Sequence, residues 1–485
     1  MTEHVRQKKL LTPNRTLRAW TVTFDASDVS PDGKREDLAR NMVAGVAVGG
    51  ERVRNDFDQV PIYQRPIFNA TWDPAAGRWV DFVEMGEEGF TLSPTEENRE
   101  VVYRCQPFWY KLGFEEGYGP YYVSVTDRPL EGYRLAPMFR DGSTFEYRPA
   151  FELALGTDGL PHSRAGLMPF EGSPTELMEK VFSYDDASRT ETMADWFSDY
   201  LLLLVEFATR NLQGVMRGVA QGPLSVDIFW DEEEDPDVAP GIYTVSPESF
   251  EEGKLYSFVY TDNGVRVRRE VELLSIGEYD DEVGSALYFD FEDQDEFVMA
   301  HYSAQVFDPP KKTGEALSRV LASSGRADAD PYSACVWRGK ENPWGNFSSF
   351  MSDVLIEAMG KQGMFTLHSL QDLRRFDGTL HDGYVKRAHQ NKTVFKGTTG
   401  YVVAFATAGE EPWLIPGDCN TQNPSYHFAT LYTAMPNNAS KGVRYLRVGG
   451  DYTKGTAVNH ATYEIYSDTV SYPKFGGRLI LREGL

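Results

Sequence analysis

The feature that most constrains this chain is the short segment Val336–Phe347, in which two tryptophans flank a turn. Gly339 and Pro343 lie between the two rings and indicate the turn. Large rings on such a loop bury their surface against the body of a protein. The segment therefore predicts a loop locked onto a core, and a structural role follows for Trp337, Arg338, Gly339, Glu341, Asn342, Trp344, Gly345 and Asn346.

The residues after this loop have the spacing of an amphipathic helix. Asn346 is a suitable N-cap, and Gly360 stands where a left-handed terminator is expected. The apolar positions that share one helical face are Phe347, Phe350, Met351, Val354 and Ala358. The pattern predicts a helix docked by that face.

Other segments predict a β-rich chain with one long helix. Trp20–Asp25 alternates like a half-buried strand, and a short helical piece is expected over Glu36–Met42. Met193–Met216 is the clearest helix, in which Glu206 and Arg210 stand at the spacing of an ion pair. Short alternating segments and an Asn263–Gly264 turn predict a small all-β insert over residues 224–310.

Charge and composition disfavour several classes of function. The net charge of −25 opposes binding to nucleic acid or to an anionic membrane, and no apolar run reaches the roughly 18 residues of a membrane span. The eight histidines and three cysteines have no metal-ligand spacing, so we predict no metal, no cofactor and no enzyme activity. Asp25, Asp28, Asp56 and Asp58 offer a calcium site as an alternative, although acids at turns usually cap helices.

The segment WRGKENPWGN resembles the Y/W-R-G-x-E-N-x-W-G-N segment of phage tail-fibre and virion-surface proteins. Their C-terminal domain has a C-type-lectin fold related to the formylglycine-generating enzymes. The chain also resembles the family's closing pattern at Arg444, Leu446, Arg447, Val448, Gly449, Gly450, Gly455, Gly477, Arg478 and Leu479. Tyr452 stands where the family often has Trp.

The resemblance implies an α+β fold in several parts. A C-type-lectin-like domain is expected over residues 101–223 and 311–485, interrupted by the small all-β insert at 224–310. Residues 1–100 are expected to form a β-rich N-terminal attachment region.

The stretch from Asp451 to Lys474 has the composition of an antibody combining site, because it is rich in Tyr, Asn, Ser and His. The family resemblance implies that this stretch lies on the exposed ligand-binding face of the domain. The alternative is a solvated loop whose tyrosines are partly buried. The predicted ligand-binding residues are Tyr452, Lys454, Asn459, His460, Tyr463, Tyr466, Ser467 and Tyr472.

The resemblance implies a bacteriophage or prophage virion structural protein, a tail fibre or receptor-binding subunit that attaches to the host cell surface. Expected partners are other virion proteins, a bacterial surface protein or glycan, and further copies of the chain, with a trimer as the plausible fibre form. The expected location is the virion surface, after synthesis in the host cytoplasm. Two alternatives stay open: a non-adhesive capsid or tail decoration protein, and an oxidase of the formylglycine-generating type that would use Cys335 and Cys419.

Overall fold

The fold is that of a computed structural model, which describes part of the chain. The described residues are 18–25, 30–115, 119–139, 142–186, 188–219, 222–224, 226–229, 241–262, 265–280, 284–291, 305–330, 332–358, 364–370, 372, 375–387, 394–396, 400–408, 411–420, 432–434, 441–453, 460–466 and 475–481.

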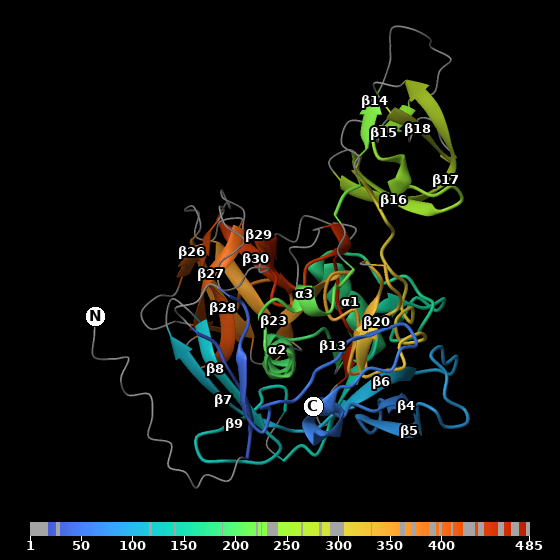
Figure 1. The fold of residues 1–485 in the computed structure, drawn as a ribbon. Coiled ribbons are helices and arrows are strands. Elements are labelled where there is room, and N and C mark those ends of the chain that lie inside the picture. Colours follow the sequence, from blue (N-terminus) through green and yellow to red (C-terminus); the bar gives the residue numbers. More distant parts are fainter. Residues whose placement is uncertain are drawn as a thin grey trace.

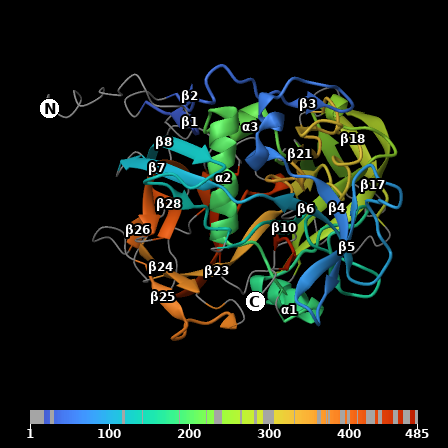
Figure 2. The ribbon, with the colours of Figure 1, turned by 90° about the horizontal axis from the view of Figure 1, so that it is seen from below.

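Helix α2 (Met193–Phe207) runs through the middle of the molecule, between sheets (Figures 1 and 2). It begins with a capping box between Thr192 and Asp195, and nearly all of its side chains are buried. A helix that is buried on all sides belongs in a core. The predicted helix is thus confirmed as far as Phe207, where Ala208 adopts a left-handed conformation with φ of 52° and ends it.

Two further α-helices are present in the described part of the chain. Helix α1 (Pro174–Tyr184) starts from Ser173, which forms a capping box with Glu176. Helix α3 (Leu212–Val215) is a single turn after α2. The described residues also include the 3-10 turns η2 (Asp56–Gln59), η3 (Pro61–Tyr63) and η4 (Pro247–Ser249).

Two antiparallel sheets form the N-terminal half of the body. The first has the strand order β2 (Lys34–Asp37), β1 (Trp20–Thr23), β8 (Gly119–Thr126), β7 (Trp109–Glu115) and β9 (Arg134–Leu135). The second has the order β10 (Glu146–Pro149), β6 (Arg99–Cys105), β4 (Ile67–Asp73) and β5 (Arg78–Glu84). The strand predicted over Trp20–Asp25 is confirmed, whereas the helical piece over Glu36–Met42 is wrong, because Lys34–Asp37 pairs with β1.

A ten-stranded sheet forms the C-terminal half of the body. Its main path is β25 (Tyr384–Lys386), β24 (Met364–Leu370), β23 (Ser348–Ala358), β30 (Gly442–Val448), β31 (Tyr463–Tyr466), β29 (Tyr432–Ala434), β27 (Gly400–Ala408) and β28 (Glu411–Asn420). Beside this path, β26 (Val394–Lys396) pairs with β24 and β32 (Phe475–Gly476) pairs with β23.

The helix predicted after Asn346 is wrong, because these residues form strand β23. Val354, Leu355 and Ile356 are all fully buried, so both faces of the strand are covered. A strand buried on both faces shows a continuous apolar run, which also satisfies helical spacing. Asn346 caps no helix and instead binds Glu152 and Lys311 with its side-chain amide.

Short strands join distant parts of the body. One sheet has the order β22 (Lys340–Glu341), β21 (Cys335–Trp337), β20 (Ser324–Arg326) and β3 (Ala47–Val48). Two-stranded pairs are β11 (Ala154–Leu155) with β12 (Pro161–His162), and β13 (Ser188–Arg189) with β33 (Ile480–Leu481). The first 100 residues therefore share sheets with later segments, since β1 pairs with β8 and β3 with β20.

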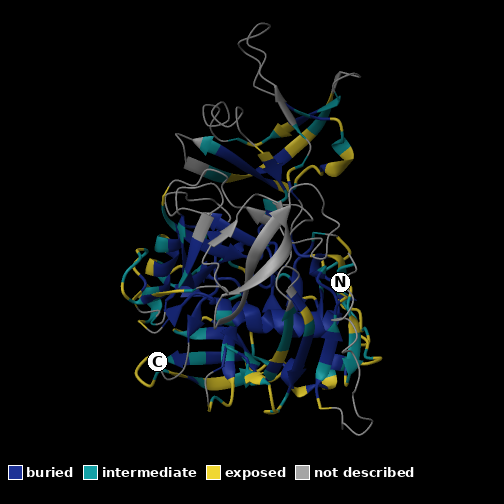
Figure 3. Ribbon diagram, turned by 90° about the vertical axis from the view of Figure 1, so that its left-hand side faces the viewer, coloured by how far each residue is buried: buried dark blue, intermediate teal, exposed yellow. Residues whose placement is uncertain are grey.

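Six strands within residues 227–307 form a sheet of their own, which we call the β-module. Its order is β14 (Asp227–Phe229), β15 (Gly241–Thr244), β18 (Gly284–Phe289), β17 (Val265–Asp280), β16 (Leu255–Asp262) and β19 (Gln305–Phe307). It projects from the body (Figure 1) and carries exposed residues on its surface (Figure 3). Strands β16 and β17 pair from Asp262↔Val265 onward, as a hairpin at the predicted turn requires, while Asn263 and Gly264 lie outside the described residues.

The expected α+β fold with a C-type-lectin-like domain is therefore wrong as a description of this structure. The described part of the chain is β-rich, built mostly from antiparallel sheets, and holds three α-helices. None of the described helices is long and apolar enough to cross a membrane.

Candidate ligand-binding cleft

The tryptophan-flanked segment begins with a tight hairpin. Strands β21 and β22 pair at Val336↔Glu341 and Trp337↔Lys340, which leaves Arg338 and Gly339 as the two turn residues. Both have positive φ, at 48° and 84°. Positive φ at both central residues is the geometry of a type I′ turn.

Arg338 and Trp337 bind a buried carboxylate on α2. Arg338 Nη2 donates to Glu206 Oε1 at 2.7 Å, and its Nε donates to Oε2 at 2.8 Å. Trp337 Nε1 donates to Oε2 at 2.9 Å and Asn55 Nδ2 to Oε1 at 2.9 Å. Burial would raise the pKa of Glu206, but Arg338 and these hydrogen bonds outweigh it and lower the pKa. The charge is thus kept inside the core.

The rest of the segment is buried and hydrogen-bonded in the same way. The Glu341 carboxylate accepts backbone N–H groups of Gly314, Ala316 and Leu317, while burial raises its pKa to about 8. Trp344 Nε1 donates to Gln213 Oε1 at 2.7 Å. All eight residues assigned a structural role lie inside the molecule, the two glycines among backbone and ring neighbours.

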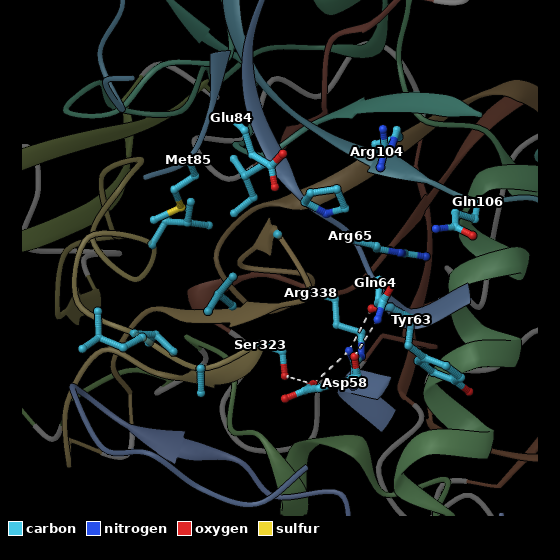
Figure 4. A pocket seen from close by; sticks show the side chains of 18 residues that line it. Asp58, Tyr63, Gln64, Arg65, Glu84, Met85, Arg104, Gln106, Ser323 and Arg338 are labelled. Atoms are coloured by element: carbon cyan, nitrogen blue, oxygen red, sulfur yellow. Dashed lines mark hydrogen bonds and ion pairs between the residues drawn. The ribbon is translucent and has the colours of Figure 1, made fainter. Parts of the chain in front are cut away.

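One side of the hairpin turn faces a surface cleft of about 600 Å³. Arg338 and Gly339 line it, and Arg338 Nη1 donates to Asp58 Oδ1 at 3.2 Å. The same oxygen accepts a hydrogen bond from Ser323 Oγ at 2.6 Å. Asp58 is held in place on one edge while 38% of its side chain stays exposed. Figure 4 shows this group at one side of the cleft.

Different elements supply the other walls. Glu84 and Met85, at the end of β5, are exposed, and Arg104 comes from β6 (Figure 4). Apolar lining comes from Ile67, Leu317, Val320, Leu321, Ala322 and Val336. Ligand sites combine apolar walls with a few convergent polar groups, and their usual volume includes this one.

The side chains that line the cleft offer several groups for binding a ligand. The lining contains carboxylates, guanidinium groups, amides and the hydroxyls of Tyr63 and Ser323, and neither histidine nor cysteine is among the lining residues. Ser323 therefore has a carboxylate partner but no imidazole to act as its base. Within the described part of the chain, no group of three His, Cys, Asp or Glu side chains is placed to hold a metal ion.

The predicted ligand-binding residues do not form an exposed patch where the structure describes them. Tyr452, His460 and Tyr463 are buried, at 2%, 1% and 0% exposure, so their prediction as surface contacts is wrong. The outcome for the others is open: Lys454, Asn459, Ser467 and Tyr472 lie outside the described residues, as does the side chain of Tyr466.

The buried three belong to the aromatic core. The His460 ring stacks on Trp196 of α2 with centroids 5.3 Å apart, and burial lowers its pKa to about 4. Tyr463 packs edge-on against the Trp196 ring, with ring centroids 5.3 Å apart. Tyr452 contacts Phe307 of the β-module at 5.8 Å. Rings near a sheet edge can serve a core or a surface, and composition does not separate the two uses.

The described residues support neither the calcium site nor the oxidase that would use Cys335 and Cys419. Asp56 pairs with Arg54 at 2.7 Å and Asp58 with Arg338, while Asp28 lies outside the described residues. Cys335 is buried and its thiol pKa is raised by that burial, which disfavours the thiolate that a metal would need. The side chain of Cys419 is outside the described residues.

Sequence reasoning missed the cleft because its residues are far apart in the chain. Asp58 and Arg338 are 280 positions apart, and Arg104 comes from a third segment. Two signals are present in the sequence: Arg338 belongs to the tryptophan-flanked segment, and Asp58 is one of the four candidate calcium ligands. No protein-family model matches the chain, and no curated protein matches it either.

Proposed function

We propose that this protein is a structural component of a bacteriophage or prophage virion surface, a tail-fibre or receptor-binding subunit. In this proposal the cleft beside Arg338 is the part that contacts the bacterial cell surface. Copies of the chain and other virion proteins would be its remaining partners.

The observation that carries the proposal is the double use of Arg338. This residue belongs to the segment that resembles phage virion-surface proteins, and its guanidinium is held by Glu206 inside the core. Its remaining nitrogen reaches Asp58 at the cleft. A rigid framework that presents a few polar groups in a preformed hollow suits recognition, because little ordering is needed when a ligand binds.

Attachment by many copies removes the need for a tight single site. A cleft that binds weakly becomes effective when several copies on one particle engage one cell. We therefore expect measurable cell retention of a multivalent form even where one chain binds in the millimolar range.

Retention on cells tests the proposal. The purified chain, coupled to fluorescent beads, is mixed with cells of the propagating bacterium and the retained fluorescence is measured. We expect retention, and an at least tenfold loss with the double variant Asp58→Asn, Arg104→Gln. The matched control Glu131→Gln, Arg134→Gln changes two exposed residues that do not line the cleft and should retain normal binding.

Two results would overturn the proposal. Absence of retention with unaltered protein would favour the non-adhesive capsid or tail decoration protein. Retention that the cleft variant does not reduce would place the cell contact elsewhere on the surface.

A further inference from the structure

Arg104 differs from the other arginines that line the cleft. Arg65 donates to Asp199 at 2.7 Å and Arg338 to Glu206 at 2.7 Å, so the charge of each is compensated inside the protein. Within the described part of the chain, Arg104 forms no ion pair, and its buried Nε has no hydrogen-bond partner. A guanidinium without a carboxylate partner is available to an anionic group from outside.

Two rings hold the Arg104 guanidinium in place. Its centre lies 4.5 Å from the Phe145 ring and 5.4 Å from the Phe68 ring. Stacking on aromatic faces fixes the plane of a guanidinium without using its outer N–H donors. The side chain therefore loses little freedom when it binds a carboxylate through two parallel hydrogen bonds.

The other sides of the cleft offer acceptors. Asp58 Oδ1 takes the hydrogen bonds of Ser323 and Arg338, and Oδ2 accepts no hydrogen bond from the residues that the structure describes. Glu84 is exposed at the end of β5. An ionised carboxylate has hydrogen-bond acceptors and no donor. A ligand that binds Asp58 and Glu84 must therefore supply O–H or N–H donors.

Exposed aromatic surface lies next to Arg104, beyond the residues that line the cleft. Phe145 and Phe82 are each 39% exposed, and Phe82 packs against Tyr147 at 4.8 Å. The negative face of a ring attracts the weakly positive C–H groups of a sugar. One ligand class combines an acid for Arg104, hydroxyl donors for Asp58 and Glu84, and C–H faces for these rings.

We infer that the cleft binds a carboxylate-bearing sugar, such as a uronic acid or a sialic acid at the end of a glycan. Arg104 binds the sugar carboxylate, and Asp58 and Glu84 bind its hydroxyl groups. The assignment rests on the proposed function of the cleft and names the ligand class for it. A volume of about 600 Å³ is within the usual range for small ligands.

The acidity of the whole chain does not prevent this binding. The net charge of −25 repels an acidic ligand at a distance. Charges farther than about 8 Å are largely screened at physiological salt, whereas a contact with Arg104 is not. Recognition of the ligand's charge therefore depends on its contact with Arg104 and not on the net charge of the chain.

Calorimetric titration of the full chain with defined sugars tests the inference. The acidic probes are digalacturonic acid and sialyllactose, and the neutral probes of matched size are galactobiose and lactose. We expect at least one acidic probe to bind about tenfold or more tightly than its neutral match. Arg104→Gln should remove this preference for the acidic probe, whereas Asp58→Asn should weaken the binding of acidic and neutral probes alike.

Controls separate recognition from damage to the fold. Arg134→Gln removes an exposed positive charge that does not line the cleft and should keep the preference. Each variant must melt within about 3 °C of the unaltered chain. Arg104→Lys keeps the charge but loses the two parallel donors, so we expect an intermediate preference.

The outcomes distinguish the ligand class from the proposed function. Equal affinity for acidic and neutral probes, or binding of none of the four, overturns the assignment of an acidic sugar. If cell retention still depends on the cleft, the proposed function survives that result. If the chain prefers acidic probes but is not retained on cells, the assignment of an acidic sugar holds. The proposed function in attachment to cells is then wrong.

Discussion

The partner of a buried charged side chain cannot be predicted from the residues near it in the sequence. The spacing of Glu206 and Arg210 predicts an ion pair, and this prediction is wrong, because Glu206 binds Arg338 instead. Helix α2 ends at Phe207, and Arg210 lies over the Phe24 ring at 4.2 Å. A fully buried carboxylate needs several donors, and only residues from distant segments bring four of them to Glu206.

The buried carboxyl group of Asp353 predicts how the stability of the protein depends on pH. It is buried, and it accepts the Met193 N–H with Oδ1 at 2.9 Å. Burial, with the nearby Asp195 charge, raises its pKa to about 7. Between the unfolded value of about 4 and pH 7, the folded chain binds a proton that the unfolded chain does not. The stability contributed by this proton is full below about pH 4 and is lost as pH rises to 7.

Asp353→Asn should therefore stabilise the protein at pH 8 and not at pH 4, since the amide oxygen can still accept the Met193 N–H without an ionisation cost. We expect a gain of about 1–3 kcal/mol at pH 8. Urea denaturation at pH 4, 6 and 8 measures it, with the exposed Glu131→Gln as control. A variant whose stability follows the same pH curve as the unaltered chain contradicts the prediction.

At the scale of elements, strand β23 shows why an apolar run is ambiguous. Its residues fit one face of a helix, yet the chain is extended and paired with β24 and β30. The β-branched residues Val354 and Ile356 suit a strand, although propensity alone rarely decides. The decisive factor is the presence of the partner strands β24, β30 and β32, of which β30 begins more than 80 residues later at Gly442.

Gly345 permits a test of the loop that precedes β23. It has φ of +90°, and a Cβ there would lie 3.0 Å from the Val219 backbone nitrogen. Gly89 has φ of +91° with no atom within 4 Å of such a Cβ. Both glycines carry the same conformational strain when replaced, so only Gly345 adds a clash with backbone.

We expect Gly345→Ala to destabilise the protein by about 1–3 kcal/mol more than Gly89→Ala does. Urea denaturation of both variants beside the unaltered chain measures the difference. Equal losses would mean that the backbone around Gly218 and Val219 yields easily, which would contradict a rigid loop.

At the scale of the whole molecule, the β-module and the body have largely separate cores. Nine buried residues of the module pack together, and Val259 and Phe307 extend into the main core of the body. The module's ends are adjacent, because Leu224 N donates to Val306 O at 2.7 Å. An ion pair between Arg268 and Glu171 also joins module and body.

This organisation predicts that the body folds without most of the module. Replacing residues 226–304 with a short Gly-Ser linker keeps Phe307 and loses Val259, so we expect a fall in melting temperature of about 5–10 °C. The cleft residues come from other segments, and cell retention should stay within twofold of that of the full chain. Calorimetric melting and the bead assay measure both quantities. Loss of cooperative melting, or of retention alone, would show that the module supports the body or the cleft.

The sequence by itself determined the elements whose signals are local. The apolar surface of α2, the alternation in β1 and the short alternating segments of the β-module were each present within short windows. The buried role of Trp337 and Trp344 followed from ring size beside a turn. Such features depend on neighbours a few positions away, so a short stretch of chain contains their cause.

Only the tertiary structure decided the rest. It made Ser348–Ala358 a strand, put Tyr452, His460 and Tyr463 inside, and brought Asp58, Arg104 and Arg338 to one cleft. Each of these outcomes depends on contacts between segments up to 280 positions apart. Burial and charge compensation are properties of what surrounds a side chain, and no local window of sequence specifies those surroundings.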